Sequence, residues 1–264
     1  MQSLKNKIIF ITGASSGIGK ACAEQCAQQG ANLIVTARRL DRLQKLSDEL
    51  VHAHDVKVLP IQLDVKDKTE VEKGIGALNQ EWKNIDILVN NAGLALTTDK
   101  IQDAKLENWD AMIDTNLKGL LYVTRAILPN MVARNQGHII NIGSVAGRDY
   151  YAGGNIYCAT KHAVKAISQC LRIDLLGTAI RVSEVAPGAV ETEFSEVRWQ
   201  DKERAKQFYA GFEALTAEDI ADAVVYCATR RKEVNIGEIT LFPLAQASAH
   251  YLYKQDTAAK TLFE

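Results

Sequence analysis

Three polar residues in the middle of the chain have the types and the spacing for acid–base chemistry. In the stretch SVAGRDYYAGGNIYCATK, Tyr157 follows Ser144 by thirteen residues and precedes Lys161 by four. If residues 157–176 form a helix, Lys161 lies one turn beyond Tyr157 on the same face. Tyrosine titrates near ~10, so it is a useful base near neutrality only if its pKa falls by roughly three units, or about 4 kcal/mol. An ammonium ~4 Å away, at an effective dielectric of ~20, supplies about that much.

Ser144 completes this group of residues. It ends the predicted strand 137–143, where its hydroxyl would hydrogen-bond a substrate oxygen and hold it against the phenol of Tyr157. The alternative is an ordinary packed tyrosine and a solvated lysine, since YxxxK occurs by chance in many proteins. Together the three residues predict proton transfer to and from the oxygen of a small alcohol or carbonyl compound.

A glycine-rich turn near the start of the chain predicts a dinucleotide site. The sequence TGASSGIGK (12–20) follows a predicted strand and begins a predicted helix. Glycines let the backbone approach a pyrophosphate closely, and the free N–H groups of the following helix attract the anion. A tight turn without a ligand is the alternative. The residues predicted to contact the cofactor here are Gly13, Ser15, Ser16, Gly17, Ile18 and Gly19.

The end of the second predicted strand indicates which dinucleotide is bound. An enzyme that uses NAD is expected to carry Asp or Glu there for the ribose 2′-hydroxyl, whereas this chain reads TARRLD, with Arg38 and Arg39. Two arginines at the start of a helix oppose its dipole, and a phosphate would offset that cost. The pattern therefore predicts NADP, with Asp41 serving the helix N-terminus.

The hydrophobic pattern predicts the elements that position these residues. Short β-branched runs typical of strands alternate with longer amphipathic segments typical of helices. Strands are predicted at 7–12, 32–37, 56–63, 86–90, 137–143, 180–186 and 238–242, and helices at 17–29, 40–53, 67–82, 106–134, 157–176 and 217–230. Such an alternation predicts an α/β Rossmann fold, a doubly wound parallel sheet with helices on both faces.

No linker, repeat or low-complexity run interrupts this series, so residues 1–264 are expected to form a single domain. Residues 190–212 are rich in charge and aromatic side chains, and a segment of that kind is predicted to be a substrate lid. Residues 246–264 are predicted to be a polar C-terminal tail.

Composition excludes several classes of partner. The net charge is −1, with 31 basic and 32 acidic residues interspersed, which favours neither nucleic acid nor a membrane surface. The apolar run in residues 1–11 is too short for a secretory signal, and no run is long enough to span a bilayer. The five cysteines form no CxxC and no metal-ligand pattern, so we expect no metal and a cytoplasmic location.

With TGASSGIG, NNAG (90–93), Ser144, Tyr157 and Lys161 in place, the chain resembles the short-chain dehydrogenase/reductase family of single-domain type. The resemblance covers roughly residues 5–245. It implies a seven-stranded Rossmann sheet, a homotetramer, and an asparagine, here Asn116 in IDTNLKGL, that holds a water in a proton relay to Lys161. The further cofactor contacts that it implies are Asp64, Val65, Asn91, Pro187, Gly188, Val190 and Thr192, besides Tyr157 and Lys161.

More narrowly, motifs such as NNAGLAL, HIINIGS and VETEFSEVR resemble those of the NADP-dependent 3-hydroxy acid dehydrogenases. That likeness implies small substrates such as L-serine, L-allo-threonine and 3-hydroxyisobutyrate. A substrate carboxylate needs a cation, and an arginine fork binds two oxygens. Arg198 in the lid and Arg148 on the loop after Ser144 are both candidates, and a surface salt bridge is the alternative for either.

Two other functions remain open at this stage. A reductase of another small aldehyde or ketone, such as sulfoacetaldehyde or a diketone, would use the same catalytic residues. A protein that binds NADPH without catalysis is disfavoured, because Asn116, Ser144, Tyr157 and Lys161 are all present.

Overall fold

The centre of the molecule is one parallel sheet of seven strands. The computed structural model describes residues 2–255 and 257–261, and its main sheet has the order β3-β2-β1-β4-β5-β6-β7. Every pairing in this sheet is parallel. The strands are β1 (Ile8–Thr12), β2 (Asn32–Ala37), β3 (Val58–Gln62), β4 (Ile87–Asn90), β5 (Gly137–Ile142), β6 (Ile180–Pro187) and β7 (Glu238–Leu241). The predicted seven-stranded doubly wound fold is confirmed.

The five inner strands are largely buried, because apolar side chains pack on both faces of the sheet. In β1, Ile9 and Ile11 belong to one hydrophobic core and Phe10 belongs to the other, as expected when successive side chains alternate between faces. Cys22 and Cys26 pack in the first core with at most 1 % of their surface exposed. Two separate cores, one on each side of the sheet, hold the strand ends in place.

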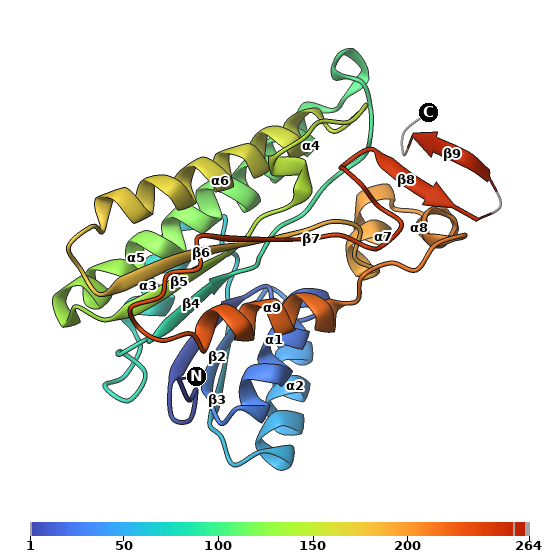
Figure 1. The fold of residues 1–264 in the computed structure, drawn as a ribbon. Coiled ribbons are helices and arrows are strands. Elements are labelled where there is room, and N and C mark those ends of the chain that lie inside the picture. Colours follow the sequence, from blue (N-terminus) through green and yellow to red (C-terminus); the bar gives the residue numbers. More distant parts are fainter. Residues whose placement is uncertain (1, 256, 262–264) are drawn as a thin grey trace.

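Helices cover both faces (Figure 1). On one side lie α1 (Gly17–Gln28), α2 (Leu40–Ala53) and α9 (Ala217–Ala228), and on the other lie α3 (Lys68–Gly76), α4 (Leu106–Ile113), α5 (Leu120–Arg134) and α6 (Asn155–Asp174). Strand order reverses between β1 and β4, and such a switch point is where open α/β sheets bind ligands, at the carboxyl ends of the strands.

Two predicted helices differ from those observed. The helix predicted at 67–82 ends at Gly76, where Gly74 and Gly76 have low helix propensity. The helix predicted at 106–134 is interrupted by a π-helical segment, η2 (Asp114–Gly119), between α4 and α5. π-Helical turns are frequent at functional sites, and this one carries Asn116.

The predicted lid contains two short helices that rest against a C-terminal hairpin. Residues 190–212 hold α7 (Glu193–Trp199) and α8 (Lys202–Tyr209). The segment predicted as a tail instead forms β8 (Tyr251–Lys254) and β9 (Thr257–Thr261), paired antiparallel; residues 256 and 262–264 lie outside the described residues. Figure 1 shows these elements together at one end of the molecule.

The hairpin is fastened to α8 by polar contacts. Lys254 Nζ donates to the carbonyl oxygens of Gln207 (3.3 Å) and Phe208 (2.7 Å), at the C-terminal end of α8. A cation is favourable at that end of a helix. Among the described residues, none of the helices combines the length and the apolar composition needed to cross a bilayer.

Candidate active site

The structure brings Ser144, Tyr157 and Lys161 together beyond the carboxyl end of β5. Ser144 follows β5 and is buried, and its Oγ accepts a hydrogen bond from Ala146 N (3.1 Å). Tyr157 lies in the first turn of α6, and Lys161 lies one turn later with its Nζ 5.9 Å from the centroid of the Tyr157 ring. Lys161 Nζ donates to Ile142 O at the end of β5 (2.9 Å). One strand end and one helical turn therefore position all three side chains.

The burial of Tyr157 and Lys161 governs their protonation. Burial raises the pKa of Tyr157, against the lowering effects of the charge on Arg198 and a hydrogen bond with the Ser144 side chain. The sequence predicted a lowered pKa with Lys161 as the nearby cation; in the structure Arg198 is the cation with the largest effect on the phenol. Burial also lowers the pKa of Lys161 to about 8, while the charge of Glu184 raises it.

Asn116 lies beside this group, but its side chain bonds the protein. Its Oδ1 accepts from Leu94 N (2.8 Å), and its Nδ2 donates to Leu94 O (2.8 Å) and to Thr160 Oγ1 (3.1 Å). A methyl group added to Gly93 would lie 3.3 Å from Asn116 Oδ1 and 3.7 Å from Lys161 Nζ. Asn116 thus ties the strand-end loop after β4 to α6, next to the ammonium.

The glycine turn leaves no room for side chains where a dinucleotide would approach. A Cβ on Gly19 would lie 2.4 Å from both Gly13 O and Asn91 Nδ2, and Gly13 has φ +69°. Asn91 Nδ2 donates to Thr12 O (2.9 Å) and Gly13 O (3.3 Å), which fixes the turn. Among the described residues, no side chain caps the N-terminus of α1 at Ser16, so its N–H groups face the turn as a phosphate site requires.

Arg39 reaches the serines of this turn. Its guanidinium donates to Ser15 Oγ (3.1 Å) and Ser16 Oγ (2.9 Å), and it also pairs with Glu193 at the start of α7 (3.1 Å). Arg42, which the sequence analysis did not single out, binds the same carboxylate at 2.7 Å. Together these residues form a cationic cluster at the mouth of the turn.

The other predicted cofactor residues occupy different places around the strand ends. Arg38 is exposed, and its carbonyl oxygen accepts from Gln62 Nε2. Asp64 follows β3, and Val65 packs against Gly119 of η2. Pro187 ends β6, and Gly188 and Val190 lead toward α7. Thr192 caps α7. A Cβ added to Gly17 would lie 3.3 Å from the Cβ of Thr192, so the lid begins against the glycine turn.

The two candidate arginines lie in different surroundings. The Arg198 Cζ is 5.3 Å from the ring centroids of both Tyr157 and Tyr151, and its Nη2 donates to the Tyr151 hydroxyl. Arg148 instead pairs with Glu184 (3.0 Å) and Glu238 (2.8 Å). These two carboxylates bind Nε and Nη1 of Arg148, whereas its buried Nη2 has no hydrogen-bond partner among the described residues. Arg198 is the candidate that faces the phenol, and substrate binding by either arginine stays a prediction.

Three residues of this site were not recognised from the sequence: Arg42, Glu193 and Phe194. Phe194 packs against Tyr157, with ring centroids 5.8 Å apart. Tyr151 bonds the lid arginine and lines a cavity of about 780 Å³ with Tyr150 and Cys158. The sequence around Arg42, Glu193 and Phe194 gave no signal, because their partners come from segments distant in sequence.

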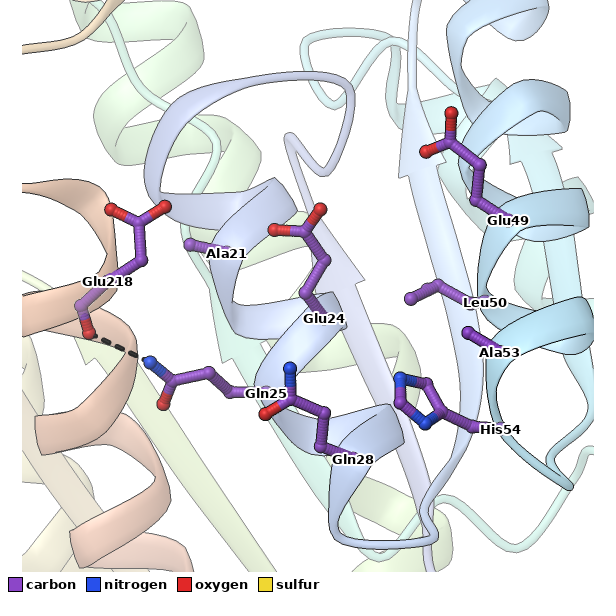
Figure 2. Close-up of a pocket in the computed structure, with 9 residues that line it drawn as sticks. All are labelled: Ala21, Glu24, Gln25, Gln28, Glu49, Leu50, Ala53, His54 and Glu218. Atoms are coloured by element: carbon purple, nitrogen blue, oxygen red, sulfur yellow. Dashed lines mark hydrogen bonds between the residues drawn. The ribbon is translucent and has the colours of Figure 1, made fainter.

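A second cavity, of about 330 Å³, lies elsewhere between α1, α2 and α9 (Figure 2). Its lining residues, among them Glu24, Glu49, His54 and Glu218, include none of the predicted site residues. Within the part of the chain that the structure describes, no three His, Cys, Asp or Glu side chains gather in a way that could hold a metal ion.

These features define a class of protein. A model of the short chain dehydrogenase family matches residues 7–203 of the chain. The chain belongs to that family, and the resemblance predicted from its motifs is confirmed.

Curated relatives narrow the comparison. The chain is 49% identical over 244 residues to the NADP-dependent 3-hydroxy acid dehydrogenase YdfG of Salmonella typhi, covering 92% of this chain and 97% of the relative. It is 44% identical to the NADP-dependent 3-hydroxy acid dehydrogenase of Schizosaccharomyces pombe, covering 97% and 99%. A solved structure of the closed form of serine dehydrogenase complexed with NADP⁺ is 48% identical and superposes with a TM-score of 0.88, covering 92% of this chain and 97% of the other.

Proposed function

We propose that this chain is an NADP(H)-dependent oxidoreductase that transfers hydride between nicotinamide and the carbinol carbon of a small 3-hydroxy acid. The observation that carries the proposal is the meeting of Ser144, Tyr157 and Arg198 at one point, where a buried phenol lies 5.3 Å from a guanidinium carbon. An acid–base group, a hydroxyl and a carboxylate-binding cation are what oxidation of a hydroxy acid requires. The names of the relatives described above support the same substrate class.

The choice of NADP rests on residues that fit its phosphates. The glycine turn and the uncapped start of α1 suit the pyrophosphate, and Arg39, with Ser15 and Ser16, suits a 2′-phosphate. We propose the remaining contacts at Arg38, Asp64, Val65, Asn91 and the 187–192 segment. When bound, NADP⁺ supplies the hydride acceptor.

In alcohol oxidation, Tyr157 takes the carbinol proton while Ser144 hydrogen-bonds the same oxygen. Hydride leaves the carbinol carbon, and the products are the carbonyl compound, NADPH and a proton. Because burial raises the pKa of Tyr157, the phenolate needs cations, which Lys161 and Arg198 supply. The side chain of Asn116 keeps the loop after β4 against α6 and so holds Lys161 at the site. Because this amide is engaged, the main-chain carbonyl of Asn116 would be the atom that holds a relay water.

Arg198 is the proposed carboxylate anchor. Its guanidinium donates to the Tyr151 hydroxyl and lies against the Tyr157 ring, so a carboxylate held there would lie beside the acid–base group. In L-serine, L-allo-threonine and 3-hydroxyisobutyrate, one carbon atom separates the carboxylate from the carbinol carbon. A sulfonate would suit the same cation, so reduction of sulfoacetaldehyde with NADPH is the second candidate.

The test is a set of initial rates. We expect reduction of NADP⁺, and slower reduction of NAD⁺, with L-serine, L-allo-threonine or 3-hydroxyisobutyrate. Turnover of sulfoacetaldehyde or diacetyl with NADPH, but of no hydroxy acid with NADP⁺, would overturn the proposed substrate class.

We propose a homotetramer in the cytoplasm, on the strength of the family resemblance. All five cysteines are free thiols, which suits a reducing compartment. Light scattering coupled to size-exclusion chromatography gives the oligomeric state directly, and a mass of about one or two protomers would contradict the tetramer.

A further inference from the structure

Arg148 binds two carboxylates that lie on neighbouring strands of the sheet. Glu184 on β6 and Glu238 on β7 are directly opposite each other in the parallel pairing of these strands. Arg148 donates to both, from Nη1 to Glu184 (3.0 Å) and from Nε to Glu238 (2.8 Å). Like charges opposite each other destabilise a sheet, so the guanidinium compensates this pair.

The same guanidinium also reaches the catalytic serine. Arg148 Nη1 donates to the carbonyl oxygen of Ser144 (2.9 Å), besides its bond to Glu184. The Glu184 side chain is 2 % exposed. A Cβ on Gly143, the residue before Ser144, would lie 2.0 Å from Glu184 Oε1. The carboxylate therefore packs directly on the backbone that carries Ser144.

Lys161 approaches this stretch of backbone as well. Its Nζ donates to Ile142 O, one residue before Gly143. A buried ammonium that has a carbonyl oxygen as its hydrogen-bond acceptor is favoured by a nearby negative charge. The charge of Glu184 raises the pKa of Lys161, against the lowering effect of burial.

We propose that the buried ion pair Arg148–Glu184 is a positioning device for the active site, in which Arg148 fixes the backbone at Ser144 and Glu184 places a negative charge against the backbone segment that Lys161 also binds. The proposal rests on the function proposed above. It gives Arg148 a positioning role in place of the substrate contact that the sequence suggested.

The two charges should act on the titration of the site in opposite directions. Glu184→Gln keeps the shape and a hydrogen-bond acceptor but removes the negative charge, so the pKa values of Lys161 and Tyr157 both fall. Arg148→Met removes the positive charge, so both pKa values rise. The other titratable or charged groups around this centre, which every variant retains, are Cys158 on α6, Asp149 and Tyr151 on the preceding loop, Glu238 on β7 and Arg198 on α7.

The experiment measures kcat/KM for hydroxy acid oxidation against pH in four proteins: wild type, Glu184→Gln, Arg148→Met and the double variant. We expect the acid limb to move down by about one pH unit in Glu184→Gln and up by about one in Arg148→Met. In the double variant it should return to within a few tenths of wild type. Single variants that move in the same direction, or four coincident profiles, would overturn the proposal.

A second readout does not depend on turnover. Side-chain NMR titration of Lys161 in the cofactor-free protein, assigned with Lys161→Met, should show a lower pKa in Glu184→Gln than in wild type. An unchanged Lys161 titration in Glu184→Gln refutes the proposed role of Glu184, even if Arg148→Met fails to fold. If instead the wild type oxidises no hydroxy acid while this titration shifts as expected, the proposed substrate class fails and the ion-pair inference survives.

Two further variants separate charge from geometry. Arg148→Lys keeps the charge but loses the planar fork that reaches Ser144 and both glutamates, so kcat should fall about tenfold with no shift of the pH profile. The matched control is Asp86→Asn, because Asp86 is a largely buried, ion-paired carboxylate at the amino end of β4. Its profile should coincide with wild type, and an equal shift in this control would show that the effect is not specific to Glu184.

Discussion

The strand-end region and the lid are held in place by different kinds of contact. In the strand-end region, defined as Gly13–Gly19 with Ser144, Tyr157 and Lys161, side chains bond the main chain: Lys161 to Ile142 O, and Asn91 to the glycine turn. The lid, defined as α7 and α8, has ring and cation contacts in addition to hydrogen bonds such as those from Lys254 to the end of α8. Arg204 stacks over Trp199 at 5.4 Å, and Lys254 of the hairpin lies 5.8 Å from the Phe208 ring.

This difference suggests that the strand-end region carries out the chemistry and that the lid selects the substrate. Main-chain contacts on a buried sheet fix atoms to within a fraction of an ångström, as proton and hydride transfer require. Ring and cation contacts on short helices tolerate repacking, so substrate selection is the property that the lid can change. We therefore expect substitutions in the strand-end region to affect all substrates equally and substitutions in the lid to affect them unequally.

The largest expected effect is that of Tyr157→Phe. Losing the acid–base group should lower kcat/KM for every substrate by about 10³-fold, while NADPH binding stays within about threefold of wild type. Steady-state rates and fluorescence titration with NADPH measure the two quantities. Retained turnover would show that Tyr157 is not the acid–base group.

A smaller effect is expected at the cofactor end of the strand-end region. Arg39→Ala removes the cation that bonds Ser15 and Ser16, so kcat/KM for NADP⁺ should fall by about 10- to 100-fold. The value for NAD⁺, which lacks the 2′-phosphate, should change less than about twofold. Lys45→Ala, which removes an exposed cation on α2, the helix that Arg39 precedes, is the control. Equal losses with both cofactors would place Arg39 away from the phosphate.

The smallest expected effect comes from the hairpin that supports the lid. Lys254→Met removes the donor to the carbonyl oxygens at the end of α8. One hydrogen bond of about 1 kcal/mol corresponds to roughly a fivefold rise in KM for the acid substrate, with kcat unchanged. Lys202→Met, an exposed lysine of α8, is the control. A fall in kcat without a change in KM would show that the hairpin acts on the chemical step.

Most of the strand-end region could be predicted from sequence, because its geometry depends on short spacings. Four residues along one helix place Lys161 beside Tyr157, and the glycine turn connects adjacent elements of the chain. The order of strands and helices followed from hydrophobic periodicity for the same reason. Outside this region, the periodicity missed the π-helical segment η2, since nothing in DTNLKG departs from an ordinary helical pattern.

The lid and the arginines could not be predicted in this way. Arg148 binds carboxylates 36 and 90 residues further along the chain, and such pairs are set by sheet register, which the local sequence does not contain. The Arg198–Tyr151 contact joins residues 47 positions apart. An arginine near Ser144 thus had two possible roles in the sequence, and the register of β6 and β7 is the observation that supports the proposed positioning role.

The most direct test of the division between chemistry and selection is the ratio of kcat/KM for a hydroxy acid to that for an uncharged carbonyl compound, measured in Arg198→Met. Because the charge of Arg198 also lowers the pKa of Tyr157, its loss should slow both substrates, but losing the charge-assisted contact should lower the rate with the acid by about 100-fold more than the rate with the uncharged compound. Arg204→Met, a lid arginine that bonds Thr98 and stacks on Trp199, should leave the ratio near the wild-type value. Equal losses for both substrates in Arg198→Met would contradict the assignment of substrate selection to the lid.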